Sequence, residues 1–68
     1  MSVDVKKLGR RIQALRASRR LSQEALAAKA DISRGYLARV ETGRHEPSLS
    51  MLDKLAKALK VKLPALLK

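Results

Sequence analysis

The sequence predicts an all-α protein in which five short helices surround one apolar core. Apolar residues recur at steps of three and four, which is the spacing of an amphipathic helix rather than of a strand. Ser or Asp stands before each of the first four of these stretches, and both residue types favour the N-cap of a helix. With 68 residues, the chain forms one domain at most. We expect helices over residues 4–19, 22–30, 33–41, 48–60 and 63–67.

The first helix is predicted from a stripe of apolar side chains that share one face. The stripe consists of Val5, Leu8, Ile12 and Leu15. A short arm, residues 1–4, precedes it, and Asp4 or Ser2 can cap its first turn. Basic residues lie off the stripe on a face that we expect to be solvated, although Arg10 and Lys6 stay open as phosphate contacts. These basic residues are Lys6, Lys7, Arg10 and Arg11.

The second and third helices are predicted to be joined by a tight turn. Ser22 and Ser33 can each cap one of them, because a hydroxyl oxygen accepts a free amide proton of the first turn. Asp31 interrupts the apolar pattern between the two helices and tolerates a left-handed backbone better than most residues. The inward residues are Leu26, Ala27 and Ala30 on the second helix and Leu37 and Val40 on the third.

The last two helices follow a loop that begins after Gly43, a residue suited to the left-handed position that closes a helix. Ser48 can cap the fourth helix, whose stripe is Leu49, Leu52, Leu55, Ala56 and Leu59. The fifth helix carries too many apolar groups for a frayed end, and we expect Leu63, Leu66 and Leu67 to contact a second copy of the chain. The expected core is Leu8, Ile12, Leu15, Leu26, Ala27, Ile32, Leu37, Val40, Leu52, Leu55 and Leu59.

The charge of the chain favours a polyanionic partner. Its 16 basic and 6 acidic residues give a formal charge of +10. The sole aromatic residue, Tyr36, argues against single-strand binding by base stacking, which needs several aromatic platforms. The chain contains no Cys and one His, so we expect no metal and no cofactor. No nucleophile–base set, carboxylate pair or phosphate-binding loop is evident in the sequence, so we expect no enzymatic activity. No apolar run reaches the ~18 residues of a membrane span and no signal peptide is evident, so we expect a cytoplasmic protein.

Residues 22–41 resemble the helix-turn-helix of the phage repressor and Cro-like family, the lambda-repressor-like DNA-binding domains. The matching residues are Gln23, Leu26, Ala27, Ile32, Leu37 and Val40, followed by Glu41-Thr42-Gly43 and Pro47-Ser48-Leu49. The resemblance extends over residues 8–67, and Asp31 departs from the Gly that the family usually has in the turn. It implies a sequence-specific regulator of transcription that binds double-stranded DNA, as a homodimer on a palindromic operator.

The resemblance also implies which residues read bases in the major groove. The positions are Arg34, Gly35 and Arg39, which helical spacing turns outward together. An arginine can pair with the O6 and N7 acceptors of guanine through two parallel hydrogen bonds. Alternatives stay open: Gly35 can meet a packing or backbone requirement, and both arginines can contact phosphates or remain solvated.

Phosphate contacts are expected around these residues. By resemblance Gln23 clamps the backbone, and Ser22 and Ser33 are caps first and phosphate donors second. The other candidates lie at the entry to the second helix, on the flank of the third, and in the loop after it: Arg19, Arg20, Tyr36, Arg44 and His45. Tyr36 can instead cover the edge of the core. The family often pairs an arginine late in the first helix with the glutamate that closes the third, here Arg16 and Glu41.

The sequence is also compatible with functions other than the regulation of transcription. An antitoxin that also binds DNA is the main alternative, although we expect no toxin-binding tail outside the five helices. A cationic membrane binder is opposed by the short, interrupted helices, and we expect no domain that senses a small-molecule effector.

Overall fold

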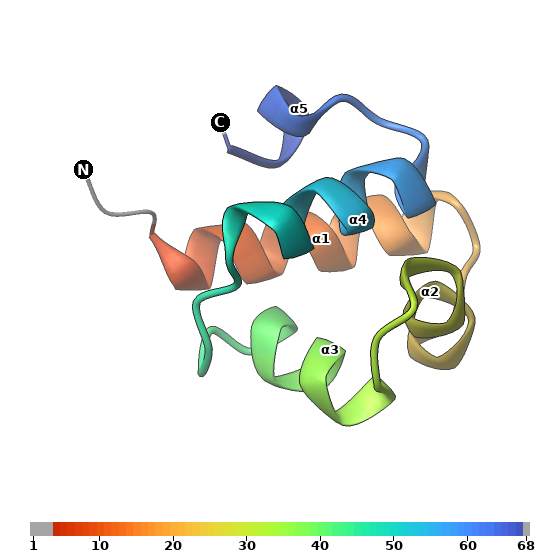
Figure 1. Ribbon diagram of the computed structural model, residues 1–68, viewed down its shortest axis with the longest axis horizontal. Coiled ribbons are helices and arrows are strands. Elements are labelled where there is room, and N and C mark those ends of the chain that lie inside the picture. The colour runs from red at the N-terminus through yellow and green to blue at the C-terminus, as the bar shows by residue number, and fades with distance from the viewer. Residues whose placement is uncertain (1–3, 68) are drawn as a thin grey trace.

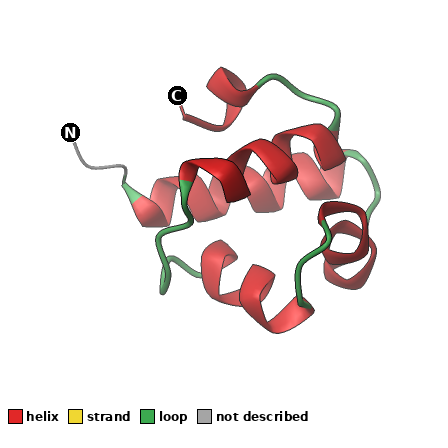
Figure 2. Cartoon of the chain, in the orientation of Figure 1, coloured by secondary structure: helices red, strands yellow, loops and turns green. Residues whose placement is uncertain are grey.

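A computed structural model describes residues 4–67, and its five helices confirm the predicted all-α fold. The helices are α1 (Val5–Ser18), α2 (Gln23–Ala30), α3 (Arg34–Glu41), α4 (Leu49–Leu59) and α5 (Leu63–Leu67). Figure 2 shows only helices and loops over the described residues. The predicted ranges had included the capping residues, which the structure leaves outside the helices. Most of the predicted arm, and Ser2 as an alternative cap, lie outside the described residues.

Each of the first four helices begins at the cap that the sequence predicted. The side chain of Asp4 accepts hydrogen bonds from the backbone N–H groups of Lys6 and Lys7, both at 3.1 Å. Ser22, Ser33 and Ser48 each accept one from the residue three positions on. The caps satisfy donors that a helix leaves free at its start, so these helices begin where their sequence dictates.

The turns rest on residues with a left-handed backbone. Asp31 (φ 57°) and Gly43 (φ 75°) adopt it, as predicted, at the ends of α2 and α3. Arg20 (φ 55°) and Lys60 (φ 59°) adopt it as well, which the sequence did not indicate. The chain therefore turns sharply after each of the first four helices, and the helices pack against one another.

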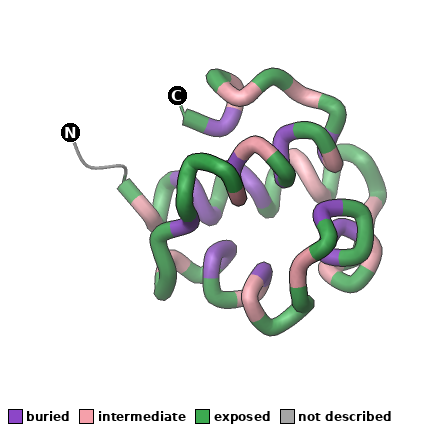
Figure 3. Tube along the Cα trace, in the orientation of Figure 1, coloured by how far each residue is buried: buried purple, intermediate pink, exposed green. Residues whose placement is uncertain are grey.

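The core contains most of the residues expected there. Within residues 4–67, twelve apolar side chains are buried: Leu8, Ile12, Leu26, Ala27, Ala30, Leu37, Val40, Leu52, Leu55, Ala56, Leu59 and Leu66. Leu15 and Ile32, also expected, are half-buried and pack against this cluster. Leu49 was wrongly placed on the inward stripe: it is 64% exposed, because it opens α4 ahead of the turns that pack on the core. Figure 3 shows the start of α4 as exposed chain.

The prediction for α5 needs a correction. Leu66 is 1% exposed and belongs to the core of the chain itself, so it is not available to a second copy. The reason is that α5 folds back onto α4 and α1. Because α5 is short, these two contacts bury most of its apolar face. Leu63 is half-buried against the core, whereas Leu67 remains 42% exposed.

The arrangement leaves α3 with one free side. α3 packs on α1 and α2 at one edge of the molecule, whereas α5 packs on α4 and α1 at the opposite edge (Figure 1). Within residues 4–67, no helix has both the length and the apolar character needed to cross a membrane.

Candidate nucleic-acid interface

Helix α3 is anchored along one side and exposed along the other. Leu37 and Val40 are at most 1% exposed and turn toward the core. Arg34, Gly35 and Arg39 are exposed, as their spacing predicted. A short helix that is fixed at its back and carries two arginines at its front is a rigid projection with cationic hydrogen-bond donors.

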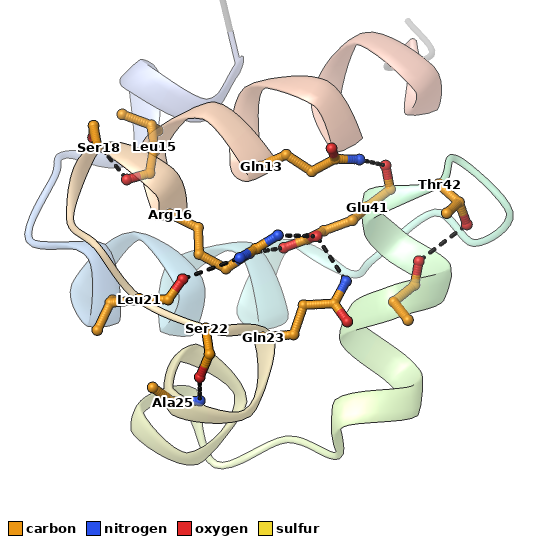
Figure 4. Close-up of polar contacts among 11 residues, drawn as sticks. Gln13, Leu15, Arg16, Ser18, Leu21, Ser22, Gln23, Ala25, Glu41 and Thr42 are labelled. Carbon is orange, nitrogen blue, oxygen red and sulfur yellow. Dashed lines mark hydrogen bonds and ion pairs between the residues drawn. The ribbon is translucent and has the colours of Figure 1, made fainter.

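The last residue of α3 anchors this helix through a buried carboxylate. Glu41 is 2% exposed. Nε of Arg16 donates to its Oε2 at 2.7 Å, and Nη2 of Arg16 donates to its Oε1 at 3.0 Å. Nε2 of Gln23 donates to the same Oε1 at 2.9 Å, and Nε2 of Gln13 donates to the backbone oxygen of Glu41 at 2.8 Å (Figure 4). The carboxylate thus ties α1, α2 and α3 together at one point.

The structure contains the expected pair of Arg16 and Glu41, and it adds Gln13 and Gln23 as further donors to Glu41. The fork of Arg16 meets both carboxylate oxygens, and its Nη1 donates to the backbone oxygen of Leu21 at 3.0 Å. The hydrogen bonds to Glu41 raise the pKa of Arg16, against a smaller opposing effect of burial. Because every buried donor and acceptor here has a partner, the pair meets the condition under which a buried ion pair holds a structure in place.

A glycine allows α1 to cross close to the end of α3. A Cβ at Gly9 would lie 2.4 Å from the backbone oxygen of Glu41 and 2.6 Å from that of Val40. No side chain fits at this distance, so the crossing requires a glycine. The contacts of Gly9 and Gln13 with the end of α3 were not predicted from the sequence. A glycine in the middle of a helix costs stability, so Gly9 inside the predicted first helix could have indicated a close contact with another segment.

On the exposed side of α3, three side chains form a cluster. The guanidinium carbon of Arg39 lies 5.9 Å from the ring centroid of Tyr36, within the range of a cation–π contact. The ring of His45 meets Tyr36 edge-on, with 5.0 Å between centroids. Burial raises the pKa of the Tyr36 hydroxyl, with Arg39 opposing, so this hydroxyl stays a neutral donor at pH 7. The ring of Tyr36 therefore contacts both Arg39 and His45.

Gly35 has no packing or backbone requirement of its own. A Cβ there would first meet Nη1 of Arg39, at an ordinary 3.9 Å, and the backbone is helical. The absence of a side chain leaves room for the guanidinium of Arg39 beside this turn of α3. The space beside Gly35 is therefore open to another molecule, and its expected role at the bases stays a prediction.

The expected phosphate contacts fall into different environments. The hydroxyl oxygens of Ser22 and Ser33 accept capping bonds from Ala25 and Tyr36, which leaves their protons free to donate. Gln23 gives one amide hydrogen to Glu41 and keeps the other. Three further candidates, Arg20, Arg44 and His45, are exposed.

Arg19 makes hydrogen bonds that the sequence did not indicate. Its Nε donates to the backbone oxygen of Leu59 at 2.9 Å, and its Nη2 approaches that of Lys60 at 3.5 Å. These carbonyl groups at the end of α4 have no partner inside the helix, so an arginine satisfies them well. The structure thus gives Arg19 a capping role that the sequence did not indicate, and the expected phosphate contact stays a prediction.

Residues 4–67 contain no group of three or more His, Cys, Asp or Glu side chains that could hold a metal ion.

The chain matches one protein family and is similar to several known proteins. A model of the helix-turn-helix family matches residues 12–66. An immunity repressor protein of Bacillus phage phi105 is 48% identical over 59 residues, which is 87% of this chain. The chain spans 41% of the length of that repressor.

Solved structures with this fold include two regulators. The restriction-modification controller protein C.AhdI from Aeromonas hydrophila has a TM-score of 0.91 and 40% identity, over 93% of this chain and 96% of its own. The clp gene regulator ClgR from Corynebacterium glutamicum has a TM-score of 0.91 and 29% identity, over 97% of this chain and 70% of its own.

Proposed function

Because this chain belongs to the helix-turn-helix family, we propose that it regulates transcription by binding double-stranded DNA with α3 in the major groove. The observation that carries the proposal is the pair of exposed arginines on α3, a helix that the buried carboxylate of Glu41 joins to α1 and α2. A major groove admits an α-helix and presents a different pattern of donors and acceptors for each base pair. Arg34 and Arg39 supply donors that match guanine, which favours sequence-specific binding.

Phosphate contacts on both sides of α3 would set its register in the groove. The start of α2 offers Ser22, Gln23 and free backbone N–H groups, and the start of α3 offers Ser33. Arg20, Arg44 and His45 extend the same contacts, and Tyr36 contributes by supporting its neighbours. Helix N-termini attract anions because their N–H groups and dipoles point outward. A regulator of this kind works where its operator lies, so the cytoplasm with its nucleoid remains the expected compartment.

We further propose that the chain acts as a homodimer on a palindromic operator. Leu49 and Leu67 are the large apolar side chains that the structure leaves exposed, at 64% and 42%, and half-buried Leu63 precedes Leu67 on α5. Burial of such groups against a second copy favours association. Dimeric readers of this type place their two recognition helices about 34–36 Å apart, one turn of DNA.

The test is the substitution Arg39→Ala, measured on an operator selected from random DNA and on its single base-pair variants. We expect affinity for the operator to fall by about 1–3 kcal/mol, with discrimination lost at one base pair in each half-site. Arg11→Ala is the matched control, because it removes the same charge from an exposed position on α1. Equal weakening on every DNA sequence would instead make Arg39 a phosphate contact and would contradict the assignment.

A further inference from the structure

A second basic surface lies on the side of α1 that faces away from α3. Gly9 and Gln13 mark the side that faces α3, since one lies against its last carbonyl groups and the other donates to one of them. Successive residues of an α-helix are rotated by about 100°. Lys7, Arg11 and Ser18 therefore project from the opposite side of α1, about 140–180° from that contact.

This surface is a shallow hollow with a basic end and an apolar end. It encloses about 690 Å³ and is lined by Lys7, Arg10, Arg11, Ala14, Leu15 and Ser18, which we call the α1 groove. The three cations stand in the first half of α1 and the small or apolar side chains in the second half. At 1.5 Å per residue the lining extends over about 16 Å, or three turns of helix.

The positive charges of the α1 groove have no carboxylate partner in the described part of the chain. No ion pair joins Lys7, Arg10 or Arg11 to any carboxylate within residues 4–67, and α1 itself contains no acidic residue. Asp4, the nearest acidic residue in sequence, is engaged as the cap of α1. Like charges three or four residues apart destabilise a helix, so this cluster weakens α1. The favourable interaction that Lys7 and Arg10 have within the fold is with the charged carboxylate of Asp4, whose pKa is lowered chiefly by the backbone hydrogen bond from Lys7 and also by these two charges.

We propose that the α1 groove docks an acidic helical segment of a partner protein. Carboxylates of that segment meet Lys7, Arg10 and Arg11, and an apolar side chain one or two turns further on seats over Ala14 and Leu15. Charge complementarity sets the orientation of the segment, and the apolar end supplies a contact that a phosphate backbone lacks. An acidic protein helix therefore fits this surface better than a second DNA duplex does.

The position of the groove allows partner and DNA to bind at the same time. α1 packs against α3 on one side and carries the groove on the other, and the arginines of α3 are exposed. DNA held by α3 consequently leaves the groove open, so the docked segment belongs to a protein recruited to, or modulated by, the DNA-bound form.

The probe for the test is a synthetic helical peptide with Glu residues on one face and one Leu placed two turns beyond them. It is titrated into the full, isotope-labelled chain at physiological salt, with amide shifts and fluorescence anisotropy as readouts. We expect the largest shifts between Lys7 and Ser18. Lys7→Glu/Arg11→Glu should weaken binding about tenfold, because it reverses two contacts. Ala14→Arg should also weaken it, since it fills the apolar end while adding positive charge.

The control pair is Lys54→Glu/Lys62→Glu, which changes the net charge equally at exposed positions outside the groove. Equal weakening by this pair, tighter binding to Ala14→Arg, or shifts centred on α3 would each overturn the proposal. So would displacement of the peptide by a DNA duplex. Circular dichroism checks that each variant is folded, and Lys7→Gln/Arg11→Gln replaces the reversal if it is not.

Discussion

The buried carboxylate of Glu41 is the joint on which the orientation of α3 depends, and Glu41→Gln tests it with the smallest change of shape. The carboxylate accepts three side-chain hydrogen bonds, two from Arg16 and one from Gln23. A glutamine offers a single oxygen, and its amide group is a donor. Whichever way the amide turns, its NH2 group faces a donor of Arg16, and in one of the two orientations it faces the donor of Gln23 as well.

The size of the effect follows from this geometry. Breaking one side of a buried ion pair costs about 3–5 kcal/mol. The side chain of Arg16 is 20% exposed, so water recovers part of the loss. We therefore expect Glu41→Gln to lower the free energy of unfolding by about 2–4 kcal/mol. For a domain of this size that corresponds to a fall of about 10–25 °C in Tm.

The assay is thermal and urea unfolding followed by circular dichroism, with Glu46→Gln as the matched control. Glu46 is exposed in the loop between α3 and α4, so its neutralisation should move Tm only slightly. If Glu41→Gln were no more destabilising than Glu46→Gln, the network would not hold α3, and the explanation of its rigidity would be wrong.

Other substitutions test the packing and the caps. Gly9→Ala should cost about 1–3 kcal/mol in urea unfolding, because its Cβ would meet backbone of α3, whereas Gly35→Ala should be neutral or stabilising. Leu37→Ala should cost about 2–5 kcal/mol, and a negligible shift in Tm would show that α3 is inverted. The backbone hydrogen bond from Lys7 lowers the pKa of Asp4, so its charged form stabilises the fold above the unfolded pKa. Asp4→Asn should therefore lower the urea midpoint at pH 7, and the gap should close as the pH falls below 3.8; a gap that persists at pH 2 contradicts this.

Local chemistry explains what the sequence predicted well. A capping bond joins residues two or three positions apart, so Asp4, Ser22, Ser33 and Ser48 could be recognised without knowledge of the fold. The left-handed turns at Asp31 and Gly43 follow from the residue types themselves. The inward side of α3 likewise follows from the helical period.

Contacts between distant segments explain what the sequence missed. The bonds of Arg19 join it to carbonyl groups 40 and 41 residues later, and their existence depends on how α1 and α4 end side by side. Leu66 and Leu67 are neighbours in sequence, and the path of the turn at Lys60 decides which of them enters the core. The role of Gly9 depends on the distance between two helix axes, which no local pattern specifies.

The central claim is that α3 reads the sequence of DNA while Glu41 holds it in place. Selection of bound duplexes from a random DNA pool at physiological salt measures this most directly. We predict a palindromic consensus with guanine in each half-site and about one helical turn between half-site centres. Recovery of DNA without any consensus, despite tight binding, would mean that α3 contributes charge alone, and the account would then be contradicted.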